Sequence, residues 1–416
     1  MISEWKKIPV ADIFSFVRSH AFSRENLTTG LASDDKVGNI HYGDIHSSYK
    51  TPSIDLDKMP IPLINDHSFN PPDKDLLVDG DLVMADASED YEGIGVTVSI
   101  HGVNSKRVVG GLHTFVLRDE KGKTNEYYRQ YIFRNPVVRN KLQKVANGVS
   151  VYGISKTEVS KIILPIPPLT EQIRIVTVLE TWDKVIDRLL KKIELKKKIK
   201  KGLMQRLLTG KVRLPGFSEK WQTIKLGDVG EIITGNTPPM KDKENYGGQY
   251  CWATAEDFNA KYIRDTVIKL SEIGKSCSRF LPAGSILVTC IASIGKNAIA
   301  GVPLATNQQI NSVVVNDKHN NEFIYYLIEN SKNLLIKNAG AGAMQILNKS
   351  VFSKLKIKVP KTREEQDAIA KILVTTDDEI RTLNCKLNQL KDQKKYLLNN
   401  LITGKIRTPE TMSINN

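Results

Sequence analysis

The sequence lacks the features that mark several common protein classes. It has only four cysteines, Cys251, Cys277, Cys290 and Cys385, with no Cys-x-x-Cys pair and no histidine cluster beside them. This pattern predicts reduced, buried thiols in a cytosolic protein and no metal site. No run of about 18 apolar residues occurs, so no membrane span is expected. The N-terminal stretch MISEWKKIPVADIF has no apolar core or cleavage site of a signal peptide.

Motifs for nucleotide or methyl-donor chemistry are also missing. The stretch ASIGK (292–296) lacks the first glycine of a phosphate-binding loop, and Asn297 follows it in place of Ser or Thr. The stretch NPPD (70–73) resembles the Asn/Asp-Pro-Pro-Tyr/Phe motif of adenine-N6 methyltransferases, but Asp73 cannot stack on a base. No FxGxG motif, Ser-His-Asp order or paired acid cluster stands out. We therefore expect no catalytic residue and no cofactor, and interpret NPPD as a proline-rich turn.

What the chain does have is positive charge. The 416 residues carry a formal net charge of +14, and the isoelectric point is near 9.3. An excess of this size attracts polyanions, of which nucleic acid is the commonest large one. Many basic proteins bind no DNA, so the charge becomes informative only together with the organisation of the chain.

The chain repeats itself. The pairs Glu171-Gln172 and Glu365-Gln366 are separated by 194 residues (365 − 171), and the Thr-Gly-Lys words at Thr209 and Thr403 have the same separation (403 − 209). Each glutamate therefore precedes its threonine by 38 residues (209 − 171). Two segments of equal length with matching ends predict two copies of one structural unit.

Both repeated segments are predicted to be long helices. They contain no proline, and Gly202 is the only glycine before the terminal Thr-Gly-Lys words. Apolar residues recur at alternating three- and four-residue spacing over about five heptads, which is typical of a coiled coil. One helix alone cannot bury such a stripe, so we expect the two to pair antiparallel; separate amphipathic helices on separate cores are the alternative.

The flanking segments repeat as well. Ser-Glu-Trp at 3–5 matches Ser-Glu-Lys-Trp at 218–221, and SKIILPIP (160–167) matches SKLKIKVP (353–360). The end of the chain leads naturally into its start, so the repeat is cyclic. The blocks between the helices are rich in Val, Ile, Thr, Gly and Asn and favour a mixed α/β (α+β) fold with substantial strand. We predict a globular block at 1–168, a helix at 169–210, a second block at 211–360, and a second helix with a tail at 361–416.

The ordered set of motifs resembles the specificity subunit of a Type I restriction-modification system over essentially the whole chain. Its carriers are LPIPPLTEQIRIV, LLTGKVRLPGF, VPKTREEQDAIAKIL and LITGKIRTP, with ITGNTPPMKDKENYGGQYCWATAEDF (233–258) and IHYGDIH (40–46) in the blocks. The second helix begins PKTREEQ where the first has PPLTEQ, one residue more. Its seam carries Thr376 where the first has Trp182.

The resemblance implies two target recognition domains related by a pseudo-twofold axis and separated by two conserved antiparallel spacer helices. Each domain would read one part of a split, asymmetric site in double-stranded DNA, and the helices would fix the gap between the parts. The resemblance also implies two methyltransferase subunits and a restriction-translocase subunit as partners, and no catalytic activity in this chain.

Candidate DNA contacts follow from residue chemistry. Amide and hydroxyl groups reach base edges, whereas lysine and arginine meet phosphates. In the second block the candidates are Asn236, Thr237, Lys241, Lys243, Ser293, Lys296, Asn297, Gln308 and Gln309. In the first block they are His41, Tyr42, Lys106 and Arg107, with His46 and His113 nearby. The alternatives are polar surface turns, a strand's polar face for the two glutamines, and packing roles for His41 and Tyr42.

Two other functional classes stay open at this point. One is a DNA-modifying methyltransferase with its own recognition domain, which the missing donor-binding and catalytic motifs disfavour. The other is a structural coiled-coil scaffold. The lysine run KKIELKKKIKK (191–201) fits a solvated helix face as well as a contact with DNA.

Overall fold

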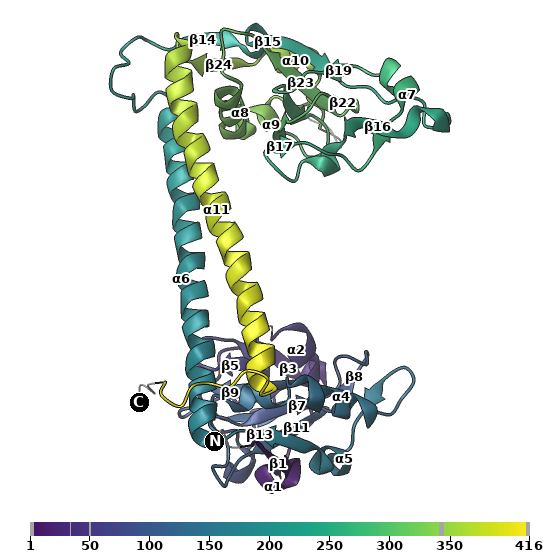
Figure 1. The fold of residues 1–416 in the computed structure, drawn as a ribbon, viewed down its shortest axis with the longest axis vertical. Coiled ribbons are helices and arrows are strands. Elements are labelled where there is room, and N and C mark those ends of the chain that lie inside the picture. Colours follow the sequence, from purple (N-terminus) through teal and green to yellow (C-terminus); the bar gives the residue numbers. More distant parts are fainter. Residues whose placement is uncertain (1–3, 34, 50, 341–344, 413–416) are drawn as a thin grey trace. The chain divides into compact units, whose positions relative to one another are not determined.

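The computed structural model describes residues 4–33, 35–49, 51–340 and 345–412. The chain folds into two compact units, unit 1 (residues 1–188 and 387–416) and unit 2 (residues 189–386). The long helices α6 (Leu169–Leu207) and α11 (Arg363–Ile402) each belong partly to both units. Each unit is therefore built from one continuous block together with pieces of both helices (Figure 1).

The described residues of unit 1 form two main sheets. The five-stranded sheet has the order β2 (Ser15–Val17), β11 (Thr114–Arg118), β7 (Leu82–Ala85), β9 (Thr97–His101), β5 (Ser53–Asp55). The four-stranded sheet has the order β10 (Val108–Gly110), β4 (Gly38–Ile40), β6 (Ile61–Ile64), β3 (Leu27–Gly30). Two strand pairs complete the unit: β1 (Lys6–Pro9) with β13 (Ile163–Ile166), and β8 (Ala87–Ser88) with β12 (Tyr152–Gly153).

Alternation along the central strands places the five-stranded sheet of unit 1 between two layers. Leu82 and Met84 face a core shared with helices, including Leu179 of α6 and Leu401 of α11. The intervening Val83 and its neighbours face the four-stranded sheet. Because successive side chains of a strand point to opposite faces, a strand buried on both sides reads as a continuous apolar run. Short helices surround these sheets: α1 (Val10–Ile13), α2 (Tyr42–Ser47), α3 (Arg129–Ile132), α4 (Pro136–Lys144) and α5 (Lys156–Lys161).

Unit 2 repeats this plan. Its five-stranded sheet has the order β15 (Gly230–Thr234), β23 (Ile310–Val315), β20 (Ile286–Thr289), β21 (Asn297–Ala300), β17 (Tyr262–Ile263). Its four-stranded sheet has the order β18 (Lys269–Leu270), β16 (Tyr246–Ala253), β22 (Leu304–Thr306), β19 (Phe280–Leu281). The pair β14 (Gln222–Lys225) with β24 (Lys356–Val359) corresponds to β1 with β13.

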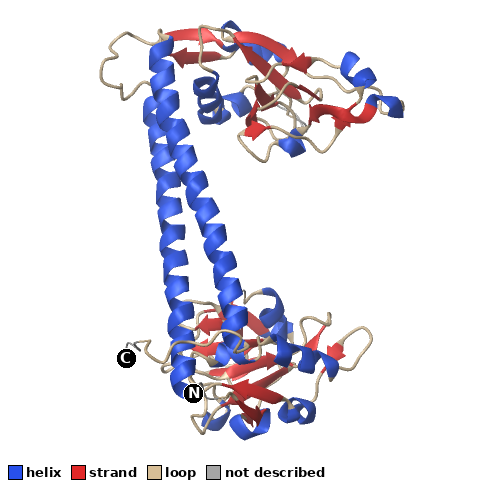
Figure 2. Cartoon of the chain, in the orientation of Figure 1, coloured by secondary structure: helices blue, strands red, loops and turns tan. Residues whose placement is uncertain are grey.

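The layering of unit 2 follows the same logic. Ile286 and Val288 pack toward the helices, and Leu287 between them packs toward the four-stranded sheet. The short helices are α7 (Glu272–Ser276), α8 (Asn321–Asn330), α9 (Lys332–Lys337) and α10 (Lys349–Lys354). Figure 2 shows strands and short helices mixed within each unit, in agreement with the predicted mixed fold class.

The two long helices lie side by side and antiparallel within each unit. In unit 1 the Lys394 ammonium contacts the Asp183 carboxylate, and in unit 2 Lys196 Nζ lies 2.5 Å from Glu379 Oε2. The predicted seam is most deeply buried toward the helix ends. Gln172, Ile175 and Leu179 are buried at the start of α6, and Gln366, Ile369 and Leu373 at the start of α11.

Each Thr-Gly-Lys word ends a helix. Gly210 and Gly404 have φ values of 67° and 72°, the left-handed conformation that glycine adopts without steric cost. A Cβ on Gly210 would lie 3.2 Å from the Trp221 ring, and one on Gly404 would lie 3.4 Å from the Trp5 ring. Each helix end therefore packs on the repeated tryptophan.

The cysteines differ in part from expectation. All four are free, and Cys251 and Cys290 are buried as predicted, but Cys277 and Cys385 are exposed. Cys385 lies on an outer face of α11, and Cys277 follows the short helix α7 on the surface. Among the described residues, no helix is long and apolar enough to cross a membrane, and no cluster of three His, Cys, Asp or Glu side chains is placed to hold a metal ion.

Candidate DNA-binding surfaces

In unit 2, most of the predicted contact residues gather at one end of the five-stranded sheet. Strand register pairs Thr234 with Asn311 and Thr289 with Ile310. The end of β15, the start of β23 and the end of β20 therefore lie together. The residues that follow or precede these strand ends are Asn236, Thr237, Ser293, Lys296, Gln308 and Gln309.

Two of the predicted amide side chains of unit 2, Asn236 and Asn297, are hydrogen-bonded to the backbone of their own unit. The Asn236 side chain donates to the carbonyl of Cys277 (2.7 Å) and accepts from the backbone N–H of Arg279 (3.0 Å). The Asn297 side chain donates to the carbonyl of Tyr325 at 2.8 Å. Both side chains thus fix the loops around them, and contacts of either with DNA stay a prediction.

The two glutamines lie in the turn between β22 and β23 and not on a strand's polar face. Thr237 donates its hydroxyl hydrogen to Gln308 Oε1, which orients the exposed amide of Gln308, and no described residue accepts from its NH₂ group. Gln309 is anchored through its backbone, because its N–H donates to Asn307 Oδ1 at 3.1 Å and its carbonyl accepts from Cys290 N at 2.8 Å. An amide with a defined orientation is suited to hydrogen bonding with a base edge or a phosphate.

Cations surround this end of the sheet. Lys241, Lys243 and Lys296 are exposed, and within the described part of the chain their ammonium groups have no hydrogen-bond or ion-pair partner. Arg279 was not predicted from the sequence; it is exposed and donates from Nη1 to the carbonyl of Thr234 at 2.8 Å. These charges create a positive potential that favours a polyanion.

In unit 1, the predicted residues separate into two places. Register pairs Thr114 with Ala85 and Met84 with Thr97, so His113, which precedes β11, lies at the same sheet end as its counterparts in unit 2. His41 and Tyr42 lie there as well, because Tyr42 N donates to the carbonyl of Leu112 at 3.3 Å. Lys106 and Arg107 follow β9 and lie at the opposite end.

Aromatic rings dominate this end of unit 1. The Tyr42 ring centroid lies 4.8 Å from that of His41 and 5.3 Å from that of His113. His113 has a φ of 51°, uncommon for a residue with a Cβ, and its Nδ1 lies 3.2 Å from Asp86 Oδ1. Burial raises the pKa of the Asp86 carboxyl, partly offset by His113. The exposed imidazole of His113 is therefore held in one orientation.

His41 has a structural task. It is buried, and its Nδ1 accepts from Gly43 N at 3.0 Å as the N-cap of α2. Burial lowers the pKa of His41, the Asp44 carboxylate opposing this, so the neutral acceptor form prevails near neutral pH. Within the chain, His41 therefore has the packing role that was the alternative to a DNA contact.

Lys106 and Arg107 are both bound within unit 1. Lys106 Nζ lies 2.5 Å from Asp57 Oδ1 and 2.9 Å from the carbonyl of Gly102. Arg107 Nη2 donates to Asn70 Oδ1 at 2.6 Å and to the carbonyl of Pro71 at 3.2 Å. Phosphate contacts by these two residues stay a prediction and would require these bonds to be exchanged. The NPPD stretch leads into a short 3-10 helix (Asp73–Asp75).

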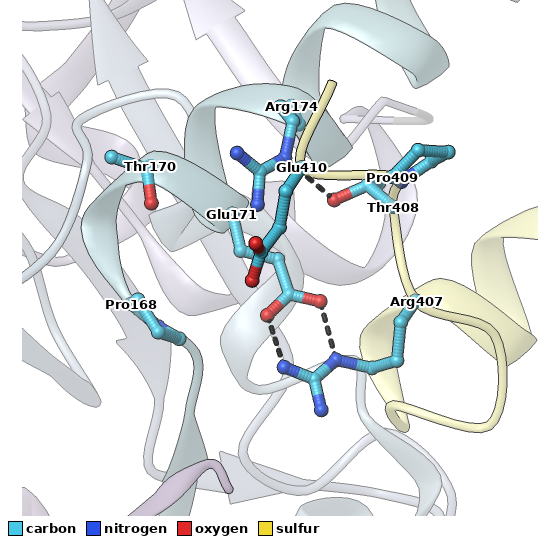
Figure 3. Close-up of a pocket in the computed structure, with 8 residues that line it drawn as sticks. All are labelled: Pro168, Thr170, Glu171, Arg174, Arg407, Thr408, Pro409 and Glu410. Carbon is cyan, nitrogen blue, oxygen red and sulfur yellow. Dashed lines mark hydrogen bonds and ion pairs between the residues drawn. The ribbon is translucent and has the colours of Figure 1, made fainter. Parts of the chain in front are cut away.

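A three-residue arrangement that sequence reasoning missed occurs once in each unit; we call it the clasp. In unit 1, Arg407 Nε and Nη2 donate to Glu171 Oε1 and Oε2 at 2.5 and 2.6 Å, and Trp5 Nε1 donates to Glu171 Oε2 at 3.1 Å. Figure 3 shows the paired guanidinium and carboxylate beside a pocket of about 430 Å³. Arg174, also at this pocket, donates from Nε to the Thr408 hydroxyl at 3.0 Å.

The clasp of unit 2 is made of Arg213, Glu365 and Trp221. Arg213 Nε and Nη2 donate to Glu365 Oε1 and Oε2 at 2.7 and 2.8 Å. Trp221 Nε1 donates to Glu365 Oε1 at 3.2 Å. The sequence contains a pattern from which both clasps could have been predicted. Arg213 and Arg407 each follow a repeated Thr-Gly-Lys word, and both tryptophans belong to the repeated flanks.

The glutamine next to each clasp glutamate fixes the loop that leads into the helix. Gln172 Oε1 accepts from Asn125 N at 2.6 Å, and its Nε2 donates to the carbonyl of Pro167 at 2.9 Å. Gln366 Oε1 likewise accepts from Asn320 N at 3.0 Å, and its Nε2 donates to the carbonyl of Pro360 at 3.4 Å and lies 3.2 Å from His319 Nδ1. The repeated Glu-Gln pair therefore has the same two roles in both copies. The glutamate binds an arginine side chain, and the glutamine binds backbone groups.

Comparisons with known proteins agree with the repeated plan. The family model described as "Type I restriction modification DNA specificity domain" matches residues 2–201 and 218–392. The putative type I restriction enzyme MjaX specificity subunit of Methanocaldococcus jannaschii is 27% identical over 420 residues, which cover 97% of this chain and 94% of the relative.

Solved structures share the fold. The HsdS subunit from Thermoanaerobacter tengcongensis superposes with a TM-score of 0.54 at 17% identity over 97% of each chain. A chain from a structure on the complex assembly and conformational transition of the type I R-M system gives 0.61 at 16% identity, over 97% of this chain and 98% of that one. The sequence family and the fold both lead to one conclusion: this chain belongs to the family of type I restriction-modification DNA specificity domains.

Proposed function

We propose that the chain is the DNA-recognition subunit of a type I restriction-modification complex and reads a bipartite, asymmetric site. One part of the site is read by unit 1 and the other by unit 2. The observation that carries this proposal is the pair of equivalent sheet ends with different side chains. Unit 1 presents Tyr42 and His113 there, whereas unit 2 presents Thr237, Lys296 and Gln308.

The chemistry of the two surfaces supports recognition of different sequences by one scaffold. A stable strand order in both units gives each surface a rigid support, while the turns between strands carry the side chains that differ. Lysines such as Lys241, Lys243 and Lys296 supply sequence-independent affinity through phosphates. Oriented groups such as the Gln308 amide supply selectivity through base edges.

The proposal assigns catalysis to partners. Two methyltransferase subunits and restriction-translocase subunits bind this chain, which has no catalytic role of its own and positions them on double-stranded DNA. The motif closest to a methyltransferase site supports this division, because Asn70 Oδ1 is bonded to Arg107 and Asp73 supplies no aromatic ring. Purified chain assayed with and without a methyltransferase partner tests it: methyl transfer by the chain alone contradicts the proposal.

Exchanging one block tests whether each unit recognises one half of the DNA site. Residues 217–350 would be replaced by the corresponding block of a relative with a different site, and the methylated sequences mapped. We expect one half of the recognised sequence to change while the other half stays the same. A change in both halves would refute the assignment of one half-site to each unit.

A further inference from the structure

The two clasps share a feature that a simple surface ion pair lacks. The Glu171 and Glu365 side chains are each only 3% exposed, although each is charged and bonded by two other side chains. Breaking a buried, doubly hydrogen-bonded ion pair is far more costly than breaking an exposed one. Each clasp is therefore a firm polar attachment that adds to the buried apolar seam of the two helices.

Each clasp joins the beginning of one long helix to the segment just beyond the end of the other. Glu171 lies in the first turn of α6 and Arg407 follows α11, whereas Glu365 lies in the first turn of α11 and Arg213 follows α6. The stretch from clasp glutamate to clasp arginine is the same in both helices, 42 residues (213 − 171 and 407 − 365). The two attachments thus mark equal lengths of chain.

The tryptophan connects each attachment to the globular part of its unit. Trp5 directly precedes β1, and Trp221 directly precedes β14. Its ring also packs against the left-handed glycine that ends the helix, Gly404 or Gly210. A clasp therefore fixes three things together: the start of one helix, the end of the other, and the first strand of the globular block.

We propose that the clasps are positioning elements that set how strictly the complex selects the number of base pairs between its two half-sites. This inference rests on the proposed function. A slip of one helical turn moves a helix by about 5.4 Å along its axis, whereas one base pair advances DNA by about 3.4 Å. Loosening a helix end at a clasp therefore admits a displacement larger than the step of one base pair that separates neighbouring gap lengths.

The test uses the complete chain assembled with its methyltransferase partner. DNA substrates carry the two wild-type half-sites at the native gap, one base pair shorter and one base pair longer, and the methylation rate of each is measured. The variant Glu365→Gln keeps the size of the side chain but removes the charge that Arg213 binds. We expect the ratio of native-gap to altered-gap methylation to fall by roughly tenfold, with the half-site sequences unchanged.

The chain offers a matched control. Glu379→Gln lies on the same helix and breaks a contact with Lys196 of the other helix, but both of those side chains are substantially exposed. An exposed pair contributes little, so gap selection in this variant should match the wild type. Glu171→Gln breaks the other clasp and should act in the same direction as Glu365→Gln.

Several outcomes would overturn the inference. One is an unchanged gap ratio in Glu365→Gln; another is an equal loss in Glu379→Gln; a third is an altered half-site sequence. If Glu365→Gln does not assemble, Trp221→Phe removes the indole hydrogen bond to Glu365 and part of the ring that packs on Gly210, leaves the Arg213–Glu365 pair in place, and should still relax gap selection. If the wild-type complex methylates no bipartite site, the proposed function fails, whereas strict gap selection in the variants refutes the clasps alone.

Discussion

Alanine substitution should destabilise the chain at two glycines just beyond the ends of the long helices and stabilise it at one glycine within a helix. Gly210 and Gly404 are left-handed, whereas Gly202 lies within α6, where a Cβ would have nothing within 4 Å apart from its chain neighbours and the nearby backbone of the helix itself. Alanine at Gly210 or Gly404 would be held in a conformation that costs about 1–2 kcal/mol for a residue with a Cβ. Alanine at Gly202 would instead gain up to about 1 kcal/mol of helix propensity.

The local packing refines these magnitudes. A Cβ at Gly210 lies 3.2 Å from the Trp221 ring, closer than the 3.4 Å between a Cβ at Gly404 and the Trp5 ring. The Gly210→Ala variant should therefore be at least as destabilised as Gly404→Ala. For units of about 200 residues, 1 kcal/mol corresponds to a shift in melting temperature of about 2–4 °C.

Thermal and urea unfolding of the purified full chain would measure these effects. We expect Gly210→Ala and Gly404→Ala to lower the free energy of unfolding and Gly202→Ala to raise it. Equal destabilisation by all three substitutions would refute the assignment of the Thr-Gly-Lys words as helix ends, and so would neutral behaviour of Gly210→Ala together with Gly404→Ala.

Further predictions concern pH, DNA affinity and loop order. Burial lowers the pKa of His41 below its ordinary value of 6.5. The unfolded state therefore binds the proton more tightly, and the free energy of unfolding should fall as the pH drops below about 6.5. The variant His41→Asn keeps a cap acceptor that does not titrate, so it should reduce this acid sensitivity in unfolding measurements from about pH 7.5 to about pH 5. Lys243→Gln and Lys296→Gln should each weaken DNA binding by the assembled complex on all sequences and reduce the slope of log affinity against log salt by about 1, and an unchanged slope would exclude a phosphate contact. Asn236→Ala removes the amide that bonds Cys277 O and Arg279 N at an exposed site, where water can replace it. It should therefore lower the free energy of unfolding by about 1 kcal/mol in urea unfolding, and an unchanged stability would contradict the loop-fixing role.

The repeat made the architecture predictable. Equal spacing of the Glu-Gln and Thr-Gly-Lys words, together with the apolar seam, predicted two long helices, and the structure has them at Leu169–Leu207 and Arg363–Ile402. The periodicity of apolar residues and the residues that end a helix depend on residues close together in the chain. Helices and their ends can therefore be predicted directly from the sequence. The resemblance in ordered motifs then led to the family that the comparisons show.

The partners of individual polar side chains could not be predicted. Lys106 is bound by Asp57, which lies 49 residues away, and Asn236 lies between backbone groups about 40 residues further along the chain. Such pairs depend on tertiary contacts and not on local pattern. The same reason explains the exposed thiols of Cys277 and Cys385, since burial is set by packing that cysteine spacing does not encode.

The measurement that most directly tests the central claim is a genome-wide map of methylated adenines in cells with and without the gene for this chain. We predict one bipartite asymmetric motif, with two different half-sites at a constant gap, that is methylated only when the gene is present. Identical methylation in both cells, or a gene-dependent motif that is continuous and undivided, would contradict the reading of two half-sites by two units.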